Sequence, residues 1–516
     1  MSAPTSGSET RCNLDIWLEV LKYLEPDPQI DSEDEVGLKR RTVLSIALSS
    51  PVLADVSLSV LWRHMTTLEP IVHVINADTS DAAEKFLIYQ VLPPDSGFWV
   101  PRRPILGTTQ RLRFQKYLGY IRGFHLQQFD IREMMLWPTL VTCLSLDTPL
   151  LPNLTTLSIA YQQTSMLSSW IYVAPLITSS IKLFSLSVSS TPVAEIYTTL
   201  LQTHRVAPTH IIYRGSPTKK AVQNLLQFPS LQSLRLDFSG DPSERKSSSV
   251  PVIRMFKALP HLVELGIDLR VCPISQVESP PLNLSNLLTL GVTGDTPDIG
   301  KLLKSVQCPA LRSLDVSFPQ TWNSAGSPLC SLIPRTFPNL HYLTIGRTIS
   351  HRSQAVYIED LTGLLSGLNL RSLRLNNVAS GLLQADFELL ISSWPYLRVL
   401  AIPGGCGYPF VDSRCLIPLI QNTSLHTIDL PLCFRSLAGW LQTRTVKSKS
   451  IVTDIECSTY RGVPESLHEF PNLVQNLLRL FPMLRRITGG EAHEDGSLVQ
   501  VQQAVNTFRE LLLDHI

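Results

Sequence analysis

Residues 309–316 read PALRSLDV, and this phrase decides how the chain folds. Proline is followed by leucine at the third and sixth positions and by an aliphatic residue at the eighth. In its second half, apolar residues alternate with small or polar ones, which is typical of a strand buried on one face. Five other segments repeat the phrase closely: PNLTTLSI at 152–159, PSLQSLRL at 229–236, PHLVELGI at 260–267, PNLHYLTI at 338–345 and PYLRVLAI at 395–402.

The phrase recurs at a nearly regular interval. Looser copies are KLFSLSV at 182–188, NLLTLGV at 286–292, NLRSLRL at 369–375 and SLHTIDL at 424–430, with faint ones around 452–457 and 484–487. Counted between first leucine-type positions from 231 to 484, the shortest step is 24 residues (287 to 311) and the longest is 32 (452 to 484). This interval is close to the roughly 20–29 residues of leucine-rich repeats.

Segments between the copies carry apolar residues at helical spacing, as in Ile299, Leu302, Leu303 and Val306. Each unit is therefore one strand and one helix, and stacking buries the apolar face that a single unit leaves open. We predict an α/β leucine-rich-repeat solenoid, a horseshoe with parallel strands on its concave face. The strands should centre near residues 157, 234, 265, 290, 314, 343, 373, 400 and 428.

Some of the chain departs from the repeat. The ninth position, usually Asn or Cys, varies here, so the array should be irregular. Positions 189–228 form a gap with at best a blurred repeat near Ile211 and Ile212. Residues 497–516 have one apolar helical face, which predicts a helix that caps the open end of the array or, alternatively, docks on a partner.

Residues 12–66 have a different pattern. CNLDIWLEVLKYL at 12–24 is amphipathic, an acidic loop from Glu25 to Glu35 follows, and two more helical stretches end at Pro51 and near residue 65. We therefore predict a disordered tail at 1–11, a three-helix module at 12–66, a linker at 67–115, the irregular solenoid at 116–496 and the capping helix at 497–516.

The module resembles an F-box, in matches that include Leu14, Glu19, Val20, Leu21, Tyr23, Leu24, Leu44, Ala47, Ser49, Leu58, Leu61, Trp62 and Arg63. With the repeats, the chain resembles divergent F-box and leucine-rich-repeat proteins of mushroom-forming fungi. The resemblance implies a substrate receptor of an SCF-type cullin-RING ubiquitin ligase, which binds the adaptor subunit and, through it, the cullin. The adaptor-binding residues that it implies are Leu14, Leu18, Leu21, Leu44, Val52 and Leu53.

The alternating positions of the strands predict a surface for a protein substrate. Side chains that point away from the core should lie on the concave face. The candidates are Arg235, Asp237, Glu264, Asp268, Asp315, Tyr342, Arg374, Asn376 and Asp429. Two other interpretations remain open: an interaction scaffold outside any ligase, whose N-terminal helices only cap the array, and an enzyme hidden in the repeats.

Composition and motifs limit the classes of partner and activity that the chain can have. A net charge of +1 and 17% charged residues favour neither nucleic acid nor an anionic membrane as partner. The polar N-terminus lacks the apolar region of a secretory signal, and nine scattered cysteines favour reduced thiols, so we expect a cytoplasmic or nuclear protein, monomeric before assembly. Because no phosphate-loop, nucleophile or metal motif stands out, we expect no catalytic residues, no cofactor and no metal site.

Overall fold

The computed structural model gives the fold of most of the chain. The described residues are 16–28, 31–67, 69–76, 87–92, 96–101, 107–126, 140–141, 149–161, 173–188, 191–215, 218–237, 256, 259–270, 281–319, 322–348, 355–403, 411, 413–433, 437, 448–457, 460–461, 470–489 and 497–513.

Two compact units divide the chain, Met1–His261 and Leu262–Ile516. The strands of the first unit, in sheet order, are β1 (His64–Met65), β4 (Gly123–Leu126), β5 (Thr156–Tyr161), β6 (Leu183–Val188), β7 (His210–Gly215) and β8 (Ser233–Asp237). Those of the second unit are β9 (Glu264–Asp268), β11 (Thr289–Thr293), β13 (Ser313–Phe318), β14 (Tyr342–Arg347), β16 (Ser372–Asn376), β18 (Val399–Ala401), β19 (Thr427–Asp429), β21 (Asp454–Cys457) and β23 (Arg486–Gly489). Neighbouring strands are parallel wherever their pairing is described.

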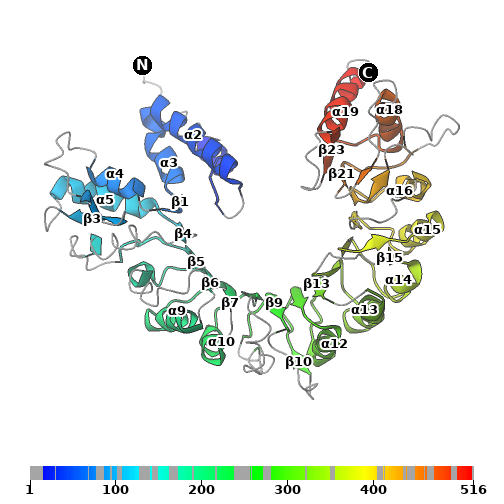
Figure 1. The fold of residues 1–516 in the computed structure, drawn as a ribbon, viewed down its shortest axis with the longest axis horizontal. Helices are drawn as coiled ribbons and strands as arrows, with labels where there is room; N and C mark the ends of the chain where they lie inside the picture. Colours follow the sequence, from blue (N-terminus) through cyan, green and yellow to red (C-terminus); the bar gives the residue numbers. More distant parts are fainter. Residues whose placement is uncertain are drawn as a thin grey trace, which may run out of the picture. The chain divides into compact units, whose positions relative to one another are not determined.

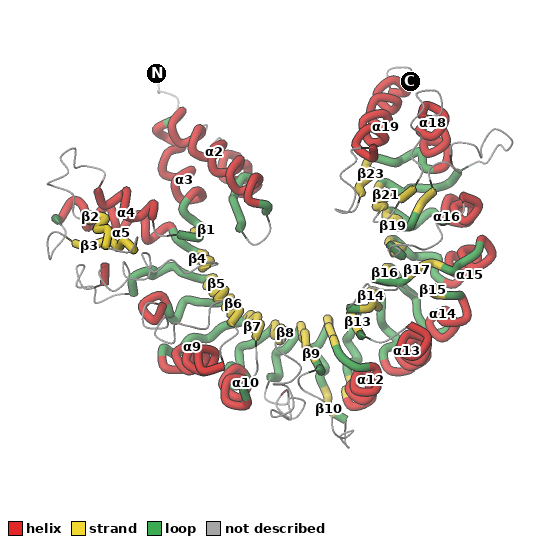
Figure 2. Tube along the Cα trace, viewed as in Figure 1, coloured by secondary structure: helices red, strands yellow, loops and turns green. Residues whose placement is uncertain are grey.

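Helices alternate with the strands. In the first unit they are α2 (Glu33–Ser49), α3 (Pro51–Leu61), α4 (Glu69–Asn76), α5 (Thr108–Tyr120), α9 (Thr191–Thr203) and α10 (Lys219–Leu225), with a 3-10 turn at Ala174–Leu176. In the second they are α12 (Thr296–Ser305), α13 (Trp322–Thr336), α14 (Ile358–Leu365), α15 (Gln384–Ser393), α16 (Leu416–Gln421), α18 (Phe470–Leu480) and α19 (Ser497–Leu513), with a 3-10 turn at Ser413–Cys415. Within the second unit, the strands line the inner side of the curve and the helices its outer side (Figures 1 and 2).

Short strand pairs complete the units. In the described part of the second unit there are three parallel pairs: β10 (Leu282–Asn283) with β12 (Val306–Gln307), β15 (Ala355–Val356) with β17 (Ala379–Ser380), and β20 (Leu432–Cys433) with β22 (Tyr460–Arg461). In the first unit, β2 (Leu87–Leu92) and β3 (Ser96–Pro101) form an antiparallel hairpin. Together with α4 and the first part of α5, this hairpin lies in the range that was predicted as a linker, 67–115.

The repeat leucines stack in register. Leu290 pairs with Leu314, Leu314 with Leu343, and the ladder continues through Leu373, Leu400, Ile428 and Ile455 to Ile487. All of these side chains are buried, and each contributes roughly 1.5–3 kcal/mol to folding. The prediction of an α/β repeat solenoid with parallel strands is confirmed, and every predicted strand centre lies in a strand of the main sheet.

The range 189–228 is not a gap in the array, and the blurred repeat expected near Ile211 and Ile212 is a complete repeat. This range holds α9, β7 and α10, and β7 pairs in register with both β6 and β8. Ile211 and Tyr213 take the two buried positions that leucine or another aliphatic residue holds in most copies. The copy is blurred in the sequence because its side chains differ from those of the phrase, although its register is the same.

The N-terminal helices join the array directly. Residues 16–23 are helical, and α2 starts at Glu33, capped by reciprocal hydrogen bonds between Ser32 and Glu35, so the acidic loop is shorter than predicted. After α3, the chain enters β1, which pairs with β4. The guanidinium of Arg40 on α2 donates to the carbonyl oxygen of His64 at 3.2 Å, which satisfies an acceptor on the terminal strand.

At the other end, α19 covers the last strand. Gln502 accepts a hydrogen bond from the backbone nitrogen of Ile487, and its side-chain nitrogen donates to the carbonyl of Arg485 at 3.0 Å. Leu498, Val501 and Val505 of α19 are buried. These contacts are those of a capping helix, because they satisfy the polar backbone at the strand that ends the sheet.

Among the described residues, no helix is long and apolar enough to cross a membrane. Free cysteines fill core space instead of forming disulfides there: Cys308, Cys330, Cys415 and Cys457 are buried. Burial raises the pKa of the Cys308 thiol to about 12, so this thiol stays protonated near neutral pH.

The buried ladder predicts a sharp contrast between neighbouring positions. Leu314 is buried in β13, whereas the adjacent Ser313 is partly exposed. Leu314→Asp should lower the free energy of unfolding by more than about 4 kcal/mol, because it buries an unpaired charge, and Ser313→Asp by less than about 1 kcal/mol. Chemical denaturation measures both. Equal losses would contradict the assigned faces. Ser372, the corresponding position in β16, is buried and does not serve as a control.

Candidate functional site

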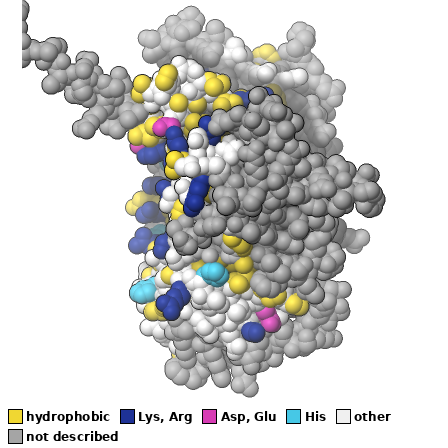
Figure 3. Space-filling view, turned by 90° about the vertical axis from the view of Figure 1, so that its left-hand side faces the viewer, with side chains coloured by type: hydrophobic (Ala, Val, Ile, Leu, Met, Phe, Trp, Pro, Cys, Tyr) yellow, Lys and Arg dark blue, Asp and Glu magenta, His cyan; other side chains and the backbone are white. Residues whose placement is uncertain are grey.

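A set of exposed apolar side chains covers the N-terminal helices, and we call it the N-terminal apolar surface. Its members are Ile16, Trp17, Leu18, Val20, Tyr23, Leu38, Leu44, Leu48 and Val52. Viewed from the side of these helices, the molecule shows hydrophobic side chains gathered toward the top (Figure 3). Tyr23 and Leu48 are 82% and 79% exposed, fractions far above those of a packed side chain. Large apolar side chains exposed in such number on one small module are typical of an interaction site.

The local structure explains why these side chains stay outside. The core of the module is small, with Leu21, Val43 and Val60 buried and Leu24, Ile46, Val56 and Leu61 packed against them. In the helix at 16–23, only Leu21 is buried. On α2, Leu38, Leu44 and Leu48 lie within about 120° of one another around the axis at 3.6 residues per turn. The helices therefore carry more apolar surface than their own core can bury.

The six residues implied by the F-box resemblance divide between surface and core. Leu18, Leu44 and Val52 are exposed and belong to the N-terminal apolar surface. Leu21 and Leu53 are buried, so they hold the helices together and are not available to a partner in this arrangement. Leu14 lies outside the described residues. Spacing alone did not separate the two groups, because the helices are apolar on more than one face.

The residues predicted for the concave face are only partly open to solvent. Arg235, Glu264, Asp315, Tyr342 and Asn376 are exposed, and Asp237 and Arg374 are partly so. In the first unit, Arg235 donates to Asp237 at 2.9 Å, and Arg214 of β7 approaches the same carboxylate at 3.4 Å. In the second unit, Thr344 pairs with Asp315 on one side and with Arg374 on the other.

Two of these predictions need correction, because Asp268 and Asp429 are buried. Both stand at the last position of their strand. The carboxylate of Asp268 accepts hydrogen bonds from the backbone and the guanidinium of Arg270, two residues later. The hydrogen bond between the Asp268 carboxylate and the Arg270 guanidinium raises the pKa of Arg270. Asp268 therefore stabilises the turn after β9 and is not presented to a substrate.

The second unit also carries a row of basic residues, which we call the basic row: Arg312, His341, Arg371, Arg398 and His426. Each precedes a strand, and four backbone hydrogen bonds link them in order, from His341 to Arg312 (2.9 Å), Arg371 to His341 (2.7 Å), Arg398 to Arg371 (2.7 Å) and His426 to Arg398 (2.8 Å). The backbones of adjacent members are thus separated by about one strand spacing across the sheet, roughly 4.8 Å.

Charge accumulates along the basic row. Within the described part of the chain, no ion pair joins Arg312, Arg371 or Arg398 to a carboxylate, and all three are exposed. Partial burial and the positive charges of Arg371 and Arg312 lower the pKa of His341. Sequence inspection missed the row, although each member stands at the same fourth position of its repeat phrase.

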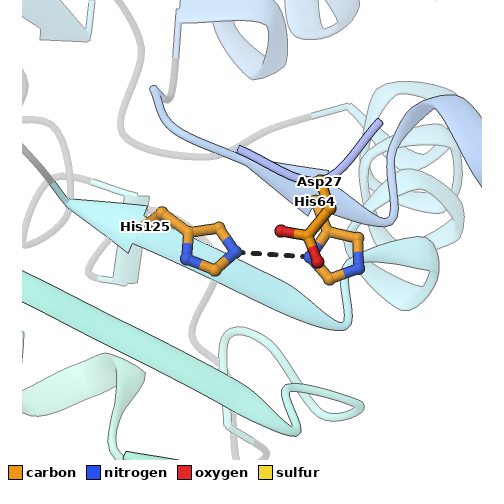
Figure 4. A group of neighbouring side chains, drawn as sticks. All are labelled: Asp27, His64 and His125. Carbon is orange, nitrogen blue, oxygen red and sulfur yellow. Dashed lines mark hydrogen bonds between the residues drawn. The ribbon is translucent and has the colours of Figure 1, made fainter. Parts of the chain in front are cut away.

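A second cluster lies where the N-terminal helices meet the sheet. His64 in β1 is opposite Gly123 in β4, and His125 follows two residues later on the same face of β4. His64 Nδ1 and His125 Nε2 are 3.3 Å apart, and Asp27 lies beside them (Figure 4). One donor atom from each of the three side chains lies within 4.8 Å of the other two, which makes them a candidate metal-ligating group among the described residues. Sequence spacing gave no hint of it.

Gly123 makes this meeting of rings possible. A Cβ atom at position 123 would lie 2.3 Å from His64 Nδ1 and 3.1 Å from His125 Nε2. Any side chain here would push the two imidazoles apart, so the cluster depends on glycine at this position.

Carboxylates control the electrostatics of the cluster. Glu25 accepts from His64 Nε2 at 3.0 Å and from Arg63 at 2.6 Å. Burial would raise the pKa of Glu25, but the His64 hydrogen bond and the charges of Arg63 and His64 outweigh it and lower that pKa. Burial, followed by the charge of His64, lowers the pKa of His125 to about 4 against an opposing effect of Asp27. His125 is therefore neutral near pH 7.

Comparisons with known proteins add little. No family model matches the chain, and no curated protein does. The chain is similar to a chain of the yeast Rad7–Elc1 complex, with 12% identity and a TM-score of 0.38 over 69% of this chain and 81% of that one. A Bacteroides fragilis protein has 14% identity and a TM-score of 0.25 over 40% and 69%. A leucine-rich-repeat protein of Leptospira interrogans has 14% and 0.22 over 67% and 84%. At these values, the likenesses carry no argument about function.

The low pKa of His125 predicts a pH-dependent stability. Between pH 6.5 and about 4, the unfolded chain binds a proton at His125 that the folded chain does not, so stability falls as the pH drops through this window. From pH 7 to pH 5, the native protein should lose about 2 kcal/mol more than His125→Gln. Denaturant titrations with chelator present measure the difference.

The matched control for this experiment is His210→Gln, at an exposed histidine in β7. It should keep the pH dependence of the native chain. Identical pH profiles for the native protein and His125→Gln would show that His125 does not control acid stability.

Proposed function

We propose that this chain is the substrate receptor of an SCF-type cullin-RING ubiquitin ligase, working in the cytoplasm or nucleus. The N-terminal helices bind the small adaptor subunit, and the repeats hold a protein substrate. One observation carries the proposal: in the helix at 16–23, five large apolar side chains are exposed, Ile16, Trp17, Leu18, Val20 and Tyr23. The F-box resemblance of the same segment supports the choice of an adaptor as the partner.

The energetics favour a partner for this surface. Covering one such side chain removes apolar area from water and contributes roughly 1.5–3 kcal/mol before the costs of association. A few well-buried anchors of this size account for most of the binding energy in protein interfaces. Leu18, Leu44 and Leu48 are suitable anchors, because their exposure means that binding needs no unfolding of the module core.

In this function the chain supplies position and not chemistry. Because β1 follows α3 almost directly and pairs with β4, strand hydrogen bonds join the adaptor-binding helices to the first repeats. The Arg63–Glu25 ion pair ties the loop after the helix at 16–23 to the residue before β1. Such a connection holds an adaptor at a defined place relative to the first repeats. A bound substrate would then have a high effective concentration near the ubiquitin-conjugating enzyme.

A non-ligase scaffold is the second candidate function, and one observation favours it. The module closes the N-terminal end of the sheet through Arg40 and β1, which is all that a cap needs to do. A cap, however, does not need the N-terminal apolar surface, which lies on side chains outside these contacts. Adaptor binding separates the two functions.

The docking prediction targets exposed positions only. Leu18→Glu together with Leu48→Glu should weaken binding of the purified chain to the adaptor subunit by at least about thirtyfold, which is about 2 kcal/mol. Leu112→Glu, at a leucine of α5 whose exposed fraction lies between those of Leu18 and Leu48, is the matched control and should bind as the native chain does. Calorimetry measures the affinities, and circular dichroism checks that all variants fold. If the native chain does not bind the adaptor at micromolar concentrations, the ligase function is wrong and the module is a cap.

The basic row suggests the kind of substrate segment that the second unit accepts. The basic row has one basic side chain in each of five successive repeats, and three of the five are arginines. Such a row attracts carboxylate-rich segments. Arg371→Ala with Arg398→Ala should weaken binding of a glutamate-rich peptide by about tenfold or more at low salt and reduce its salt dependence. Arg335→Ala, in α13, is the control. Fluorescence anisotropy measures this binding, and a lysine-rich peptide that bound equally well would exclude charge recognition.

A further inference from the structure

The cluster of Asp27, His64 and His125 holds donor atoms of a kind that bind transition metals. Imidazole nitrogens and a carboxylate oxygen suit Zn²⁺, whereas Mg²⁺ and Ca²⁺ prefer sites made of oxygen alone. The three residues come from separate segments: the loop after the helix at 16–23, strand β1 and strand β4. We propose that they form a binding site for a divalent transition-metal ion, with Zn²⁺ as its best match and water completing the coordination.

The distance between the two ring nitrogens fits such an ion. With Zn–N bonds of about 2.0–2.1 Å, two nitrogens of a tetrahedral site lie about 3.3–3.4 Å apart. His64 Nδ1 and His125 Nε2 are 3.3 Å apart. The ring centroids are 5.6 Å apart and the ring planes differ by 19°, so the rings meet nitrogen to nitrogen. Each ring must turn by roughly 35° to direct its lone pair at a shared tetrahedral ion.

Glu25 orients the first of these ligands. Its carboxylate accepts a hydrogen bond from His64 Nε2 at 3.0 Å. In the neutral form of the ring, which is the form that binds a metal, this bond leaves Nδ1 as the nitrogen without a proton, on the side of His125. A histidine that ligates a metal through one nitrogen usually donates from the other to a carboxylate, and such a partner raises the affinity of the site. His64 has this arrangement with Glu25.

The remaining features of the cluster are compatible with an ion. When the His64 ring is neutral and donates from Nε2 to Glu25, its Nδ1 accepts from His125 Nε2. The proton on Nε2 of His125 must then move to Nδ1 of the same ring when the ion binds. The carboxylates of Asp27 and Glu25 provide two negative charges against the dication, although Arg63 offsets part of the second. His125 is 1% exposed, whereas the side chain of His64 is 17% exposed, so an ion reaches the cluster from the side of β1.

A bound ion would act as a staple. It would tie the loop at Asp27 and strand β1 to strand β4, which fastens the N-terminal helices to the first repeat. Because the unfolded chain does not bring the three side chains together, ion binding should stabilise the folded state. This inference does not rest on the proposed ligase function, since a staple at this place serves an adaptor-binding module and a simple cap equally well.

The test is a zinc titration of the chelator-treated full chain by calorimetry, with circular dichroism as the check of folding. We expect one Zn²⁺ per chain with a Kd of about 10 µM or tighter, no response to Mg²⁺, and a rise in Tm on addition of zinc. Co²⁺ should give the absorption of a four-coordinate site. His64→Gln should abolish the tight site, and Asp27→Asn, which preserves side-chain shape, should weaken it at least about tenfold.

Two further variants make the result decisive. Glu25→Gln leaves all three ligands in place and should lower the affinity roughly 10–100-fold, which a purely structural role for Glu25 would not do. His341→Gln with His426→Gln removes two histidines of the basic row and should leave zinc binding unchanged. No binding by the folded native chain at about 100 µM zinc, or equal binding by folded His64→Gln, would overturn the proposal.

Discussion

Parallel registration of short apolar strands is the constraint on which the rest of the structure depends. A single repeat has a strand with one buried face and a helix with one apolar stripe, and neither is covered within the repeat. Burial is achieved only when Leu314 lies between Leu290 and Leu343, and when the same relation holds for each neighbour along the ladder. Irregularity between the strands is tolerated, as the varied ninth position shows, because the loops do not set this register.

A stack of this kind has two ends, and each is a strand with unpaired polar backbone. The chain satisfies them differently. At the C-terminus, α19 places Gln502 against the backbone of β23. At the N-terminus, α2 places Arg40 against the carbonyl of His64 in β1. Because the N-terminal helices have this structural task, their inner residues are committed to the fold, and only their outer side chains are available for a partner.

The repeat was predictable because each copy keeps the same spacing of apolar residues. With Ile211 in place of leucine and Tyr213 in place of an aliphatic residue, the copy at β7 was only faintly visible in the sequence, although the physics of that strand is unchanged. The prediction for the module was weaker. Helices that are apolar on several faces do not reveal which leucine is inside, so Leu21 and Leu53 could not be separated from Leu18 and Leu44 by spacing.

The cluster at the first two strands was unpredictable for another reason. His64 and His125 are separated by 61 positions, and nothing local to either residue indicates the other. They meet because β1 pairs with β4 in a register that sets His64 opposite Gly123. The ring of His64 therefore lies beside His125, which is two positions after Gly123 on the same face. If that register shifted by one residue, His64 and His125 would point to opposite faces of the sheet. The ligand group is thus a consequence of the same parallel registration that buries the leucines, acting here on polar side chains.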